Sequence, residues 1–133
     1  MDLLVYAILG LTATWLLYVG YMYVATRAAE GRSAEPVFEV FPQLREHRGK
    51  ALIYCFSPQC GPCRPMSKAV DALIAEGAPI FKLDIGEQPA LARELGIRAT
   101  PTLIVMETGT ICRMLLGAKT ARFMHELVSV PAS

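Results

Sequence analysis

Charge is scarce in this sequence and nearly balanced. Only 19 % of the 133 residues are charged, 13 of them basic and 12 acidic, so the formal net charge is +1. A chain this close to neutral lacks the electrostatic footprint of a protein that binds a polyanion, so composition gives no support for nucleic-acid binding. The sequence also shows no internal repeat and no low-complexity tract.

Cysteine is also scarce, and its distribution argues against a scaffold held together by disulfides. Two of the four cysteines, Cys55 and Cys112, lie inside apolar runs and have no obvious mates. Single cysteines in such runs usually act as small buried hydrophobes, so we expect both to lie in the core. The other two, Cys60 and Cys63, are separated by Gly61 and Pro62 in a CGPC segment.

Residues 3–25 contain no Asp, Glu, Lys, Arg or His. As a helix this run is roughly 34 Å long, enough to cross about 30 Å of hydrocarbon with some tilt. Tyr18, Tyr21 and Tyr23 gather at its C-terminal end, where tyrosine favours the headgroup zone. We predict a transmembrane anchor at 1–26, a polar linker at 27–35 and a folded domain at 36–133. A cleaved signal peptide is the alternative, but it requires a basic start and a shorter apolar stretch.

The flanking charges predict which way the anchor is inserted. No basic residue precedes the apolar run, whereas Arg27 and Arg32 follow it, and Arg45, Arg48 and Lys50 come next. The positive-inside rule therefore favours a domain in the cytoplasm, on a single-pass protein of the bacterial inner membrane. A domain facing the periplasm is the alternative.

From residue 36 onward, apolar runs alternate with amphipathic segments, in roughly 95 residues that are enough for one core. The pattern predicts the order β-α-β-α-β-α-β-β-α, hence an α/β fold in which helices flank a mixed sheet. The last two strands are joined by a hairpin signal and should form an antiparallel edge. Strands are expected at 37–40, 51–56, 80–85, 102–106 and 111–116. Helices are expected at 41–48, from the CGPC segment to Gly77, at 88–95 and at 121–128.

The CGPC segment lies between a predicted strand and a predicted helix, which suggests redox chemistry. Free N–H groups and the helix dipole favour a thiolate at a helix N-terminus, so Cys60 is the expected nucleophile. Cys63, one turn further in and more enclosed, is the expected resolving thiol, and Gly61 and Pro62 keep the turn tight. A zinc half-site is the alternative, but structural zinc takes four ligands and the sequence offers one CxxC and two isolated histidines.

Together with the CGPC segment and the strand order, three further segments make residues 37–128 resemble thioredoxin. They are Lys82-Leu83-Asp84, the Gly-Ile-Arg-Ala-Thr-Pro-Thr stretch at 96–102, and Gly117 before a helix. The resemblance implies a thioredoxin fold after the transmembrane helix. It also implies a cis bond before Pro101, which would face the cysteines. The backbone of Thr100 would then pair with an extended substrate.

The sequence departs from the thioredoxin pattern around the cysteines. Tyr54 stands where the family usually has a buried Asp that is thought to assist proton transfer to the resolving cysteine. We therefore expect Cys63 to rely on water, Lys82 or the Tyr54 hydroxyl, and Lys82 could also favour a thiolate. Gln59 and Phe56 replace tryptophans, which makes the rim of the site more polar.

These features predict a membrane-tethered protein-disulfide reductase of thioredoxin type. Its clients would be membrane or membrane-proximal proteins. Its only redox group would be the Cys60–Cys63 disulfide, with no metal and no other cofactor. Electrons would come from a donor such as thioredoxin reductase or a membrane thiol relay. Two alternatives remain: an accessory subunit of a membrane complex that uses the fold for binding, and an outward-facing redox or assembly factor for exported cysteine proteins.

Overall fold

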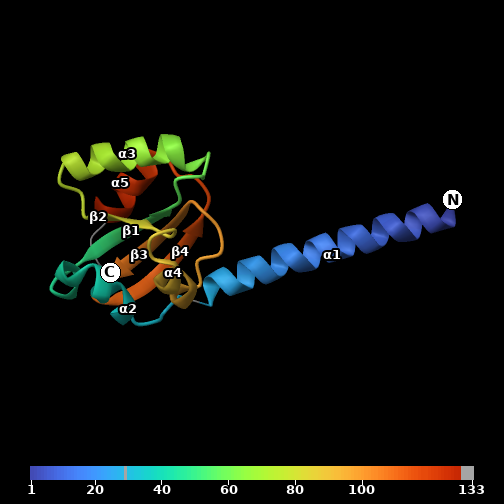
Figure 1. The fold of residues 1–133 in the computed structure, drawn as a ribbon, viewed down its shortest axis with the longest axis horizontal. Helices are drawn as coiled ribbons and strands as arrows, with labels where there is room; N and C mark the ends of the chain where they lie inside the picture. The colour runs from blue at the N-terminus through green and yellow to red at the C-terminus, as the bar shows by residue number, and fades with distance from the viewer. Residues whose placement is uncertain (29, 130–133) are drawn as a thin grey trace.

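A long apolar helix and a small α/β domain make up the computed structural model of this protein, which describes residues 1–28 and 30–129 (Figure 1). The helix, α1 (Asp2–Arg27), has no charged residue between its two terminal residues. It projects from one side of the domain, and its most apolar stretch is not buried against any other part of the described chain. By length and composition α1 can cross a membrane. The predicted boundary at 133 and linker residue 29 lie outside the described residues.

The domain is built on a four-stranded mixed sheet. Its strands are β1 (Lys50–Phe56), β2 (Ile80–Asp84), β3 (Thr102–Glu107) and β4 (Thr110–Leu116), arranged in the order β2-β1-β3-β4. β1 and β2 run parallel, whereas β1 with β3 and β3 with β4 run antiparallel. The predicted antiparallel hairpin is therefore present at one edge of the sheet, where β4 is the edge strand and β3 lies between β4 and β1.

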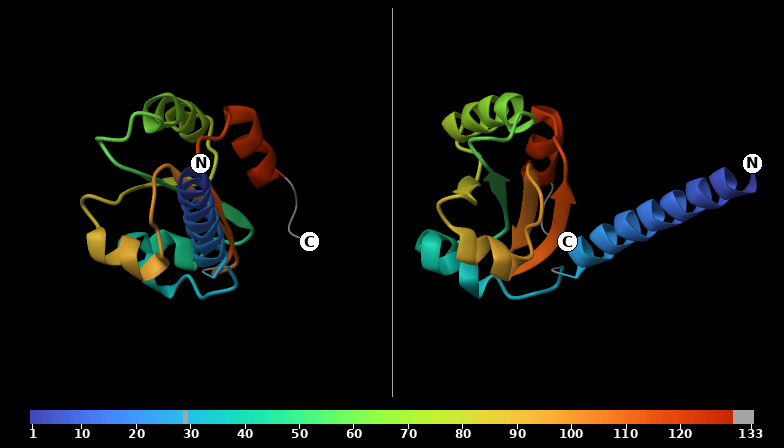
Figure 2. Two further views of the ribbon diagram at one scale, coloured as in Figure 1. Left: turned by 90° about the vertical axis from the view of Figure 1, so that its right-hand side faces the viewer. Right: turned by 45° about the vertical axis from the view of Figure 1, so that its right-hand side comes forward.

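Helices cover both faces of the sheet (Figures 1 and 2). One face packs against α3 (Cys63–Ala75) and α5 (Ala121–Ser129). The other face packs against α2 (Glu35–Val40), the short 3-10 helix η1 (Pro42–Arg45) and α4 (Pro89–Leu95). Alternate residues of β1 therefore enter different cores, Leu52 and Tyr54 beneath α3 and Ile53 and Cys55 on the opposite side.

The helix after the CGPC segment forms as its sequence predicts. Met66, Val70 and Leu73 recur at helical spacing and are buried against the sheet. Pro65 lies in the first turn, where its missing N–H leaves no hydrogen bond unmade. Gly77, with a φ of 91°, follows the last turn in a backbone conformation that glycine adopts at little cost.

The prediction for residues 37–48 was wrong. No strand forms at 37–40, because Pro36 lies in the first turn of a helix and Val37 and Phe38 turn their side chains into the core. The predicted helix at 41–48 shortens to the single turn of η1. The sheet accordingly has four strands among the described residues, not five.

The segment predicted as a polar linker is tied to the edge of the sheet. The N–H of Gly31 donates to the Ile111 carbonyl at 2.7 Å, and the Ile111 N–H donates to the Arg32 carbonyl at 2.9 Å. Ala34 continues the pairing by donating to the Gly109 carbonyl at 3.0 Å. These bonds cover the start of the exposed edge of β4 and fix where α1 leaves the domain.

Candidate active site

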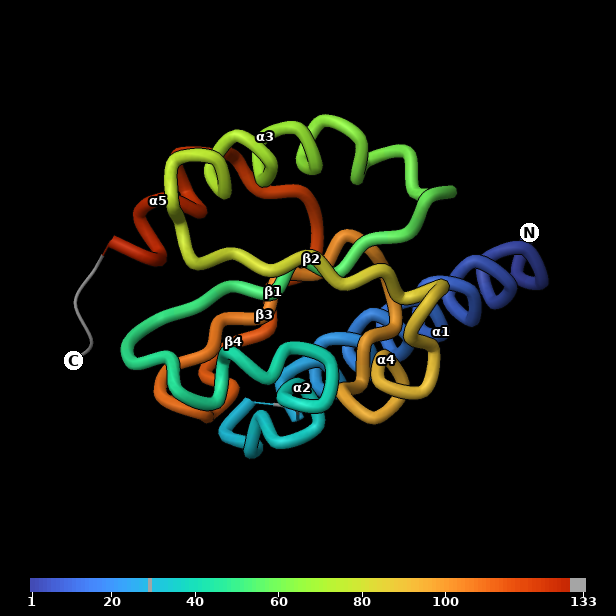
Figure 3. Tube along the Cα trace, turned by 60° about the vertical axis from the view of Figure 1, so that its left-hand side comes forward, coloured from blue at the N-terminus to red at the C-terminus, as the bar shows by residue number. Residues whose placement is uncertain are grey.

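The two cysteines of the CGPC segment lie between the C-terminal end of β1 and α3, in a stretch that Figure 3 traces from one element to the other. The Cys60 N–H donates to the Ser57 carbonyl at 3.1 Å, which closes the turn that follows the strand. The N–H of Arg64 then donates to the Gly61 carbonyl at 3.1 Å and starts the helix. β1 ends and α3 begins within seven residues, so the cysteines are positioned by two rigid elements.

Cys60 and Cys63 form a disulfide, with Cα atoms 5.3 Å apart. Their exposures differ: Cys60 is half-buried, whereas Cys63 is only 2 % exposed. The helix begins at Cys63 rather than at Cys60, so the expectation that Cys60 opens the helix and Cys63 lies one turn inside was wrong. Because Cys60 precedes α3 and reaches solvent, a second disulfide can approach it more readily than it can approach Cys63.

A shallow, mostly apolar groove borders the disulfide. Its volume is about 370 Å³. The loop from Phe56 to Pro58 forms one part of its wall, and the exposed face of the first turns of α3 forms the rest. Gln59, beside Cys60, is exposed and accepts a hydrogen bond from the Ser57 hydroxyl at 2.9 Å, but it does not line the groove. Such a groove suits an extended, partly apolar segment beside a disulfide.

Tyr54 lies beneath Cys63 and is fully buried. Its hydroxyl donates to the Cys63 carbonyl at 2.9 Å and therefore accepts from the Ser67 hydroxyl at 2.8 Å. Burial raises the pKa of Tyr54 above its ordinary value, although the Ser67 hydrogen bond acts in the opposite direction. The hydroxyl is thus protonated at neutral pH, and its hydrogen is directed to the Cys63 backbone rather than to the sulfur.

Lys82 is the neighbour of Tyr54 on the adjacent strand, as the register of β1 and β2 requires. Its ammonium lies 3.0 Å from a carboxylate oxygen of Asp71 and 5.2 Å from the ring centroid of Phe56. The lysine is exposed, and its ammonium is paired with a carboxylate rather than isolated beside the cysteines. Its charge is shared with a carboxylate two helical turns beyond Cys63.

Pro101 follows a cis peptide bond from Thr100, as the resemblance implied. The pairing of Cys55 with Thr102 places Pro101 next to the end of β1, where the CGPC loop starts. The Pro101 carbonyl accepts the Gly117 N–H at 2.9 Å, so the residue just before β3 is bonded to the residue just after β4. Thr100 is half-buried at the same end of the sheet.

The remaining two cysteines differ from each other. Cys55 is fully buried, as predicted, and burial raises the pKa of its thiol. Cys112 is only half-buried on the edge strand, so its assignment to the core was wrong. Burial and the nearby Glu107 carboxylate still raise the pKa of the Cys112 thiol, which disfavours a reactive thiolate there.

The sequence reasoning overlooked Ser67 and Asp71. Both follow Cys63 at steps of four residues on α3 and therefore lie on the helix face that Cys63 also occupies. That spacing was visible in the sequence. Their partners on β1 and β2 became clear only once the strand register was known.

Comparison with known proteins agrees with this geometry. The family described as Thioredoxin matches residues 37–129. A chloroplastic M-type thioredoxin of Chlamydomonas reinhardtii is 33 % identical over 98 residues, covering 71 % of this chain and 69 % of the relative. A thioredoxin of Chlamydia muridarum is 34 % identical over 83 residues, covering 61 % and 81 %. A thioredoxin of Porphyra purpurea is 36 % identical over 70 residues, covering 50 % and 65 %, which is less than two thirds of its length.

Among solved structures, the fold resembles mitochondrial thioredoxin 3 of Saccharomyces cerevisiae in its oxidised form. The TM-score is 0.57 at 23 % identity, with 69 % of this chain and 88 % of that chain covered. At that identity the likeness concerns the fold alone. The matches leave α1 outside the shared region, because the family match begins ten residues beyond its end.

Proposed function

We propose, from the premise that this chain belongs to the thioredoxin family of disulfide oxidoreductases, that it reduces disulfides of membrane or membrane-proximal proteins while α1 holds it in the bilayer. One observation carries the redox part. A half-buried Cys60 and a buried Cys63 form a disulfide at the junction of β1 and α3.

The reaction starts from the reduced pair. The Cys60 thiolate attacks one sulfur of the client disulfide, and the other client sulfur leaves as a thiolate that takes a proton from water. Cys63 then loses its proton and attacks Cys60 Sγ. The client leaves with its second thiol, and the Cys60–Cys63 disulfide forms. Two electrons have passed to the client, so a dithiol donor must return two electrons before the next cycle.

Client access is supported by the position of α1. In Figures 1 and 3, α1 leaves the domain on the same side as the loop between β1 and α3. The guanidinium of Arg98, three residues before Pro101, lies 5.3 Å from the ring centroid of Tyr21 on α1. The active-site end of the sheet is therefore close to the end of the anchor. This arrangement favours clients whose disulfides lie near the bilayer surface, where a tether raises their effective concentration.

The redox proposal is tested with the full chain in detergent and a small-molecule disulfide, with dithiothreitol as electron donor. We expect Cys60→Ser to abolish reduction and Cys63→Ser to accumulate a mixed disulfide at Cys60. Cys112→Ala is the matched control and should retain the activity. Undiminished turnover by Cys60→Ser would overturn the proposal and favour a role as a binding subunit.

The membrane proposal is tested separately. Carbonate washing of membranes from cells that express the full chain should leave it in the pellet, and a processed, soluble product would instead indicate a signal peptide. Protease added to intact cells then separates a cytoplasmic domain, which the basic residues after α1 favour, from an exported one.

A further inference from the structure

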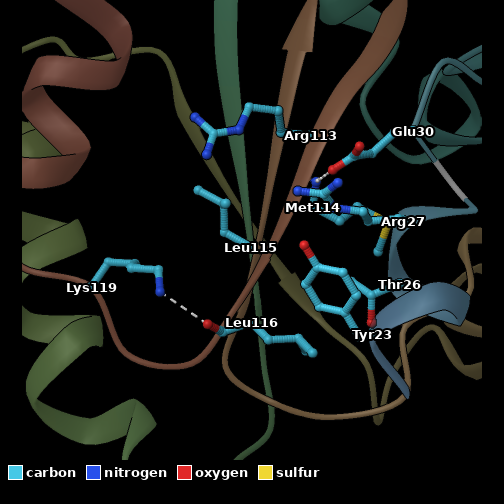
Figure 4. Close-up of a pocket in the computed structure, with 9 residues that line it drawn as sticks. All are labelled: Tyr23, Thr26, Arg27, Glu30, Arg113, Met114, Leu115, Leu116 and Lys119. Carbon is cyan, nitrogen blue, oxygen red and sulfur yellow. Dashed lines mark hydrogen bonds between the residues drawn. The ribbon is translucent and has the colours of Figure 1, made fainter. Parts of the chain in front are cut away.

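A cavity of about 280 Å³ lies where the end of α1 meets β4 (Figure 4). Tyr23, Thr26 and Arg27 line it from one face of the helix, since they are spaced by three and four residues. The final residues of β4 form the opposite wall. The cavity lies outside the active site, because neither Cys60 nor Cys63 lines it.

Three basic residues from three different segments line this cavity. Arg27 comes from α1, Arg113 from β4 and Lys119 from the loop after β4 (Figure 4). Within the described part of the chain, no ion pair involves any of the three. Glu30 is the one acidic residue among the lining residues, and it accepts the Met114 N–H at 3.5 Å.

The basic groups retain the capacity to bind an anion. Lys119 donates one hydrogen bond, to the Leu116 carbonyl at 3.0 Å, and its ammonium has two further N–H groups. The guanidinium of Arg27 lies 4.9 Å from the ring centroid of Tyr23, which orients it without neutralising it. Leu115 and Leu116 give the same cavity an apolar side. The lining thus combines an excess of positive charge with a hydrocarbon surface.

The end of α1 that lines the cavity carries residue types that favour the headgroup layer of a bilayer. Tyr23 is the last aromatic residue of α1, at the level where tyrosine favours the interface, and Arg27 lies one turn beyond it. Basic pockets beside membrane helices are suited to anionic headgroups. The cavity is slightly smaller than a typical drug-sized pocket, so it fits a headgroup and not a whole lipid.

We propose that this cavity binds the headgroup of an anionic phospholipid. The lipid would belong to the leaflet that holds the C-terminal end of α1. The phosphate would lie among Arg27, Arg113 and Lys119, and the first carbons of the lipid would lie against Leu115 and Leu116. The proposal rests on the membrane part of the proposed function and is independent of the redox chemistry. A bound headgroup would hold the end of β4 and α1 together, and would so fix the orientation of the domain on the membrane.

The test uses the full chain in a neutral detergent with equal amounts of phosphatidylglycerol and phosphatidylcholine of matched acyl chains. Native mass spectrometry counts the lipid molecules retained by each variant. We expect the wild-type chain to retain phosphatidylglycerol preferentially. Arg113→Gln/Lys119→Gln should reduce that preference roughly 25-fold, since each basic residue near an anionic surface contributes about fivefold.

Matched controls distinguish a built site from general attraction. Arg48→Gln/Lys68→Gln removes the same charge from exposed residues outside the cavity and should keep the preference. Equal losses in both double variants would overturn the proposal in favour of nonspecific attraction. Displacement of the lipid by excess inorganic phosphate would overturn the proposal in favour of a soluble anion.

Lipid retention is measured without turnover, so an inactive Cys60→Ser chain should give the wild-type result. Failure of the redox proposal would therefore be seen separately.

Discussion

The hydroxyl of Tyr54 donates a 2.9 Å hydrogen bond to the backbone carbonyl of Cys63. This bond joins the central strand of the sheet to the first residue of α3, in the layer directly beneath the disulfide. Tyr54 occupies the position at which the thioredoxin family usually has a buried Asp. In the structure its hydroxyl holds the first residue of α3 in place. We therefore expect substitution of Tyr54 to change mainly the stability of the domain.

Tyr54→Phe should lower the free energy of unfolding by about 1 kcal/mol, since it removes a buried side-chain hydrogen bond to the first residue of α3. Turnover should fall by much less than the roughly 100-fold that loss of a general acid or base causes. Denaturant unfolding of the oxidised full chain in detergent measures the first effect and disulfide reduction measures the second. Ser67→Ala is the control, because it removes the other partner of the hydroxyl and keeps the Cys63 bond. Unchanged stability in Tyr54→Phe would contradict a structural role for this contact.

Lys82 should contribute little to the reactivity of Cys60, because its ammonium already pairs with Asp71 at 3.0 Å. We expect Lys82→Met to change the alkylation rate of reduced Cys60 at neutral pH by less than about fivefold, the limit set by a screened and partly exposed ion pair. Asp71→Asn is the matched variant. It removes the carboxylate and leaves the lysine charge, so it should speed alkylation. A large slowing in Lys82→Met with no effect of Asp71→Asn would show that Lys82 acts directly on the thiolate.

Cys55 should make the domain sensitive to alkaline pH. Burial raises the pKa of its thiol above the ordinary value of 9.0, so the unfolded chain releases this proton at lower pH than the folded chain. The contribution of this thiol to the free energy of unfolding is complete below pH 9.0. It falls as pH rises above 9.0, with a slope that approaches about 1.4 kcal/mol per pH unit.

Cys55→Ala should therefore flatten the fall in unfolding free energy between pH 9.0 and 10.0, where the thiol of the unfolded chain ionises. Denaturant titrations of the oxidised chain at several pH values provide the slope. Cys112→Ala, at a half-buried thiol, should flatten it less. The same slope in wild type and Cys55→Ala would mean that the unfolded and folded chains ionise this thiol alike.

The sheet and the helices after residue 50 were predictable because each has a strong local signal. The continuous apolar run at β1 indicated a strand covered on both faces, and the spacing of Met66, Val70 and Leu73 indicated the buried face of α3. The prediction failed at 37–40, where four residues are too few to show a period. Pro36 favoured a helix start there, and packing against the sheet decided the outcome.

Contacts between distant segments could not be predicted from local patterns. The bond from Ser67 to Tyr54 requires the register of α3 over β1, and the ion pair of Asp71 requires the position of Lys82 on β2. The backbone pairing of Gly31 with Ile111 also joins segments that lie far apart in the sequence. A polar, glycine-containing segment has the composition of a linker. That composition is the same whether the segment is free or pairs with the edge of a strand.

That pairing has a measurable consequence, because it fixes the segment that connects α1 to the domain, while Tyr21 of α1 lies beside Arg98 near the active-site end of the sheet. A flexible Gly-Ser segment inserted after Ala28 would keep the bonds of Gly31 and Ala34 to β4 and release α1. We expect such a chain, reconstituted in vesicles, to reduce a bilayer-anchored disulfide peptide a few-fold more slowly, since effective concentration falls as roughly the −3/2 power of tether length. Reduction of a soluble disulfide should not change.

The same segment inserted after Met1, beyond the far end of α1, is the matched control and should leave both rates unaltered. If the insertion after Ala28 leaves the reduction of the anchored peptide as fast as in wild type, the orientation that the linker sets has no part in client access.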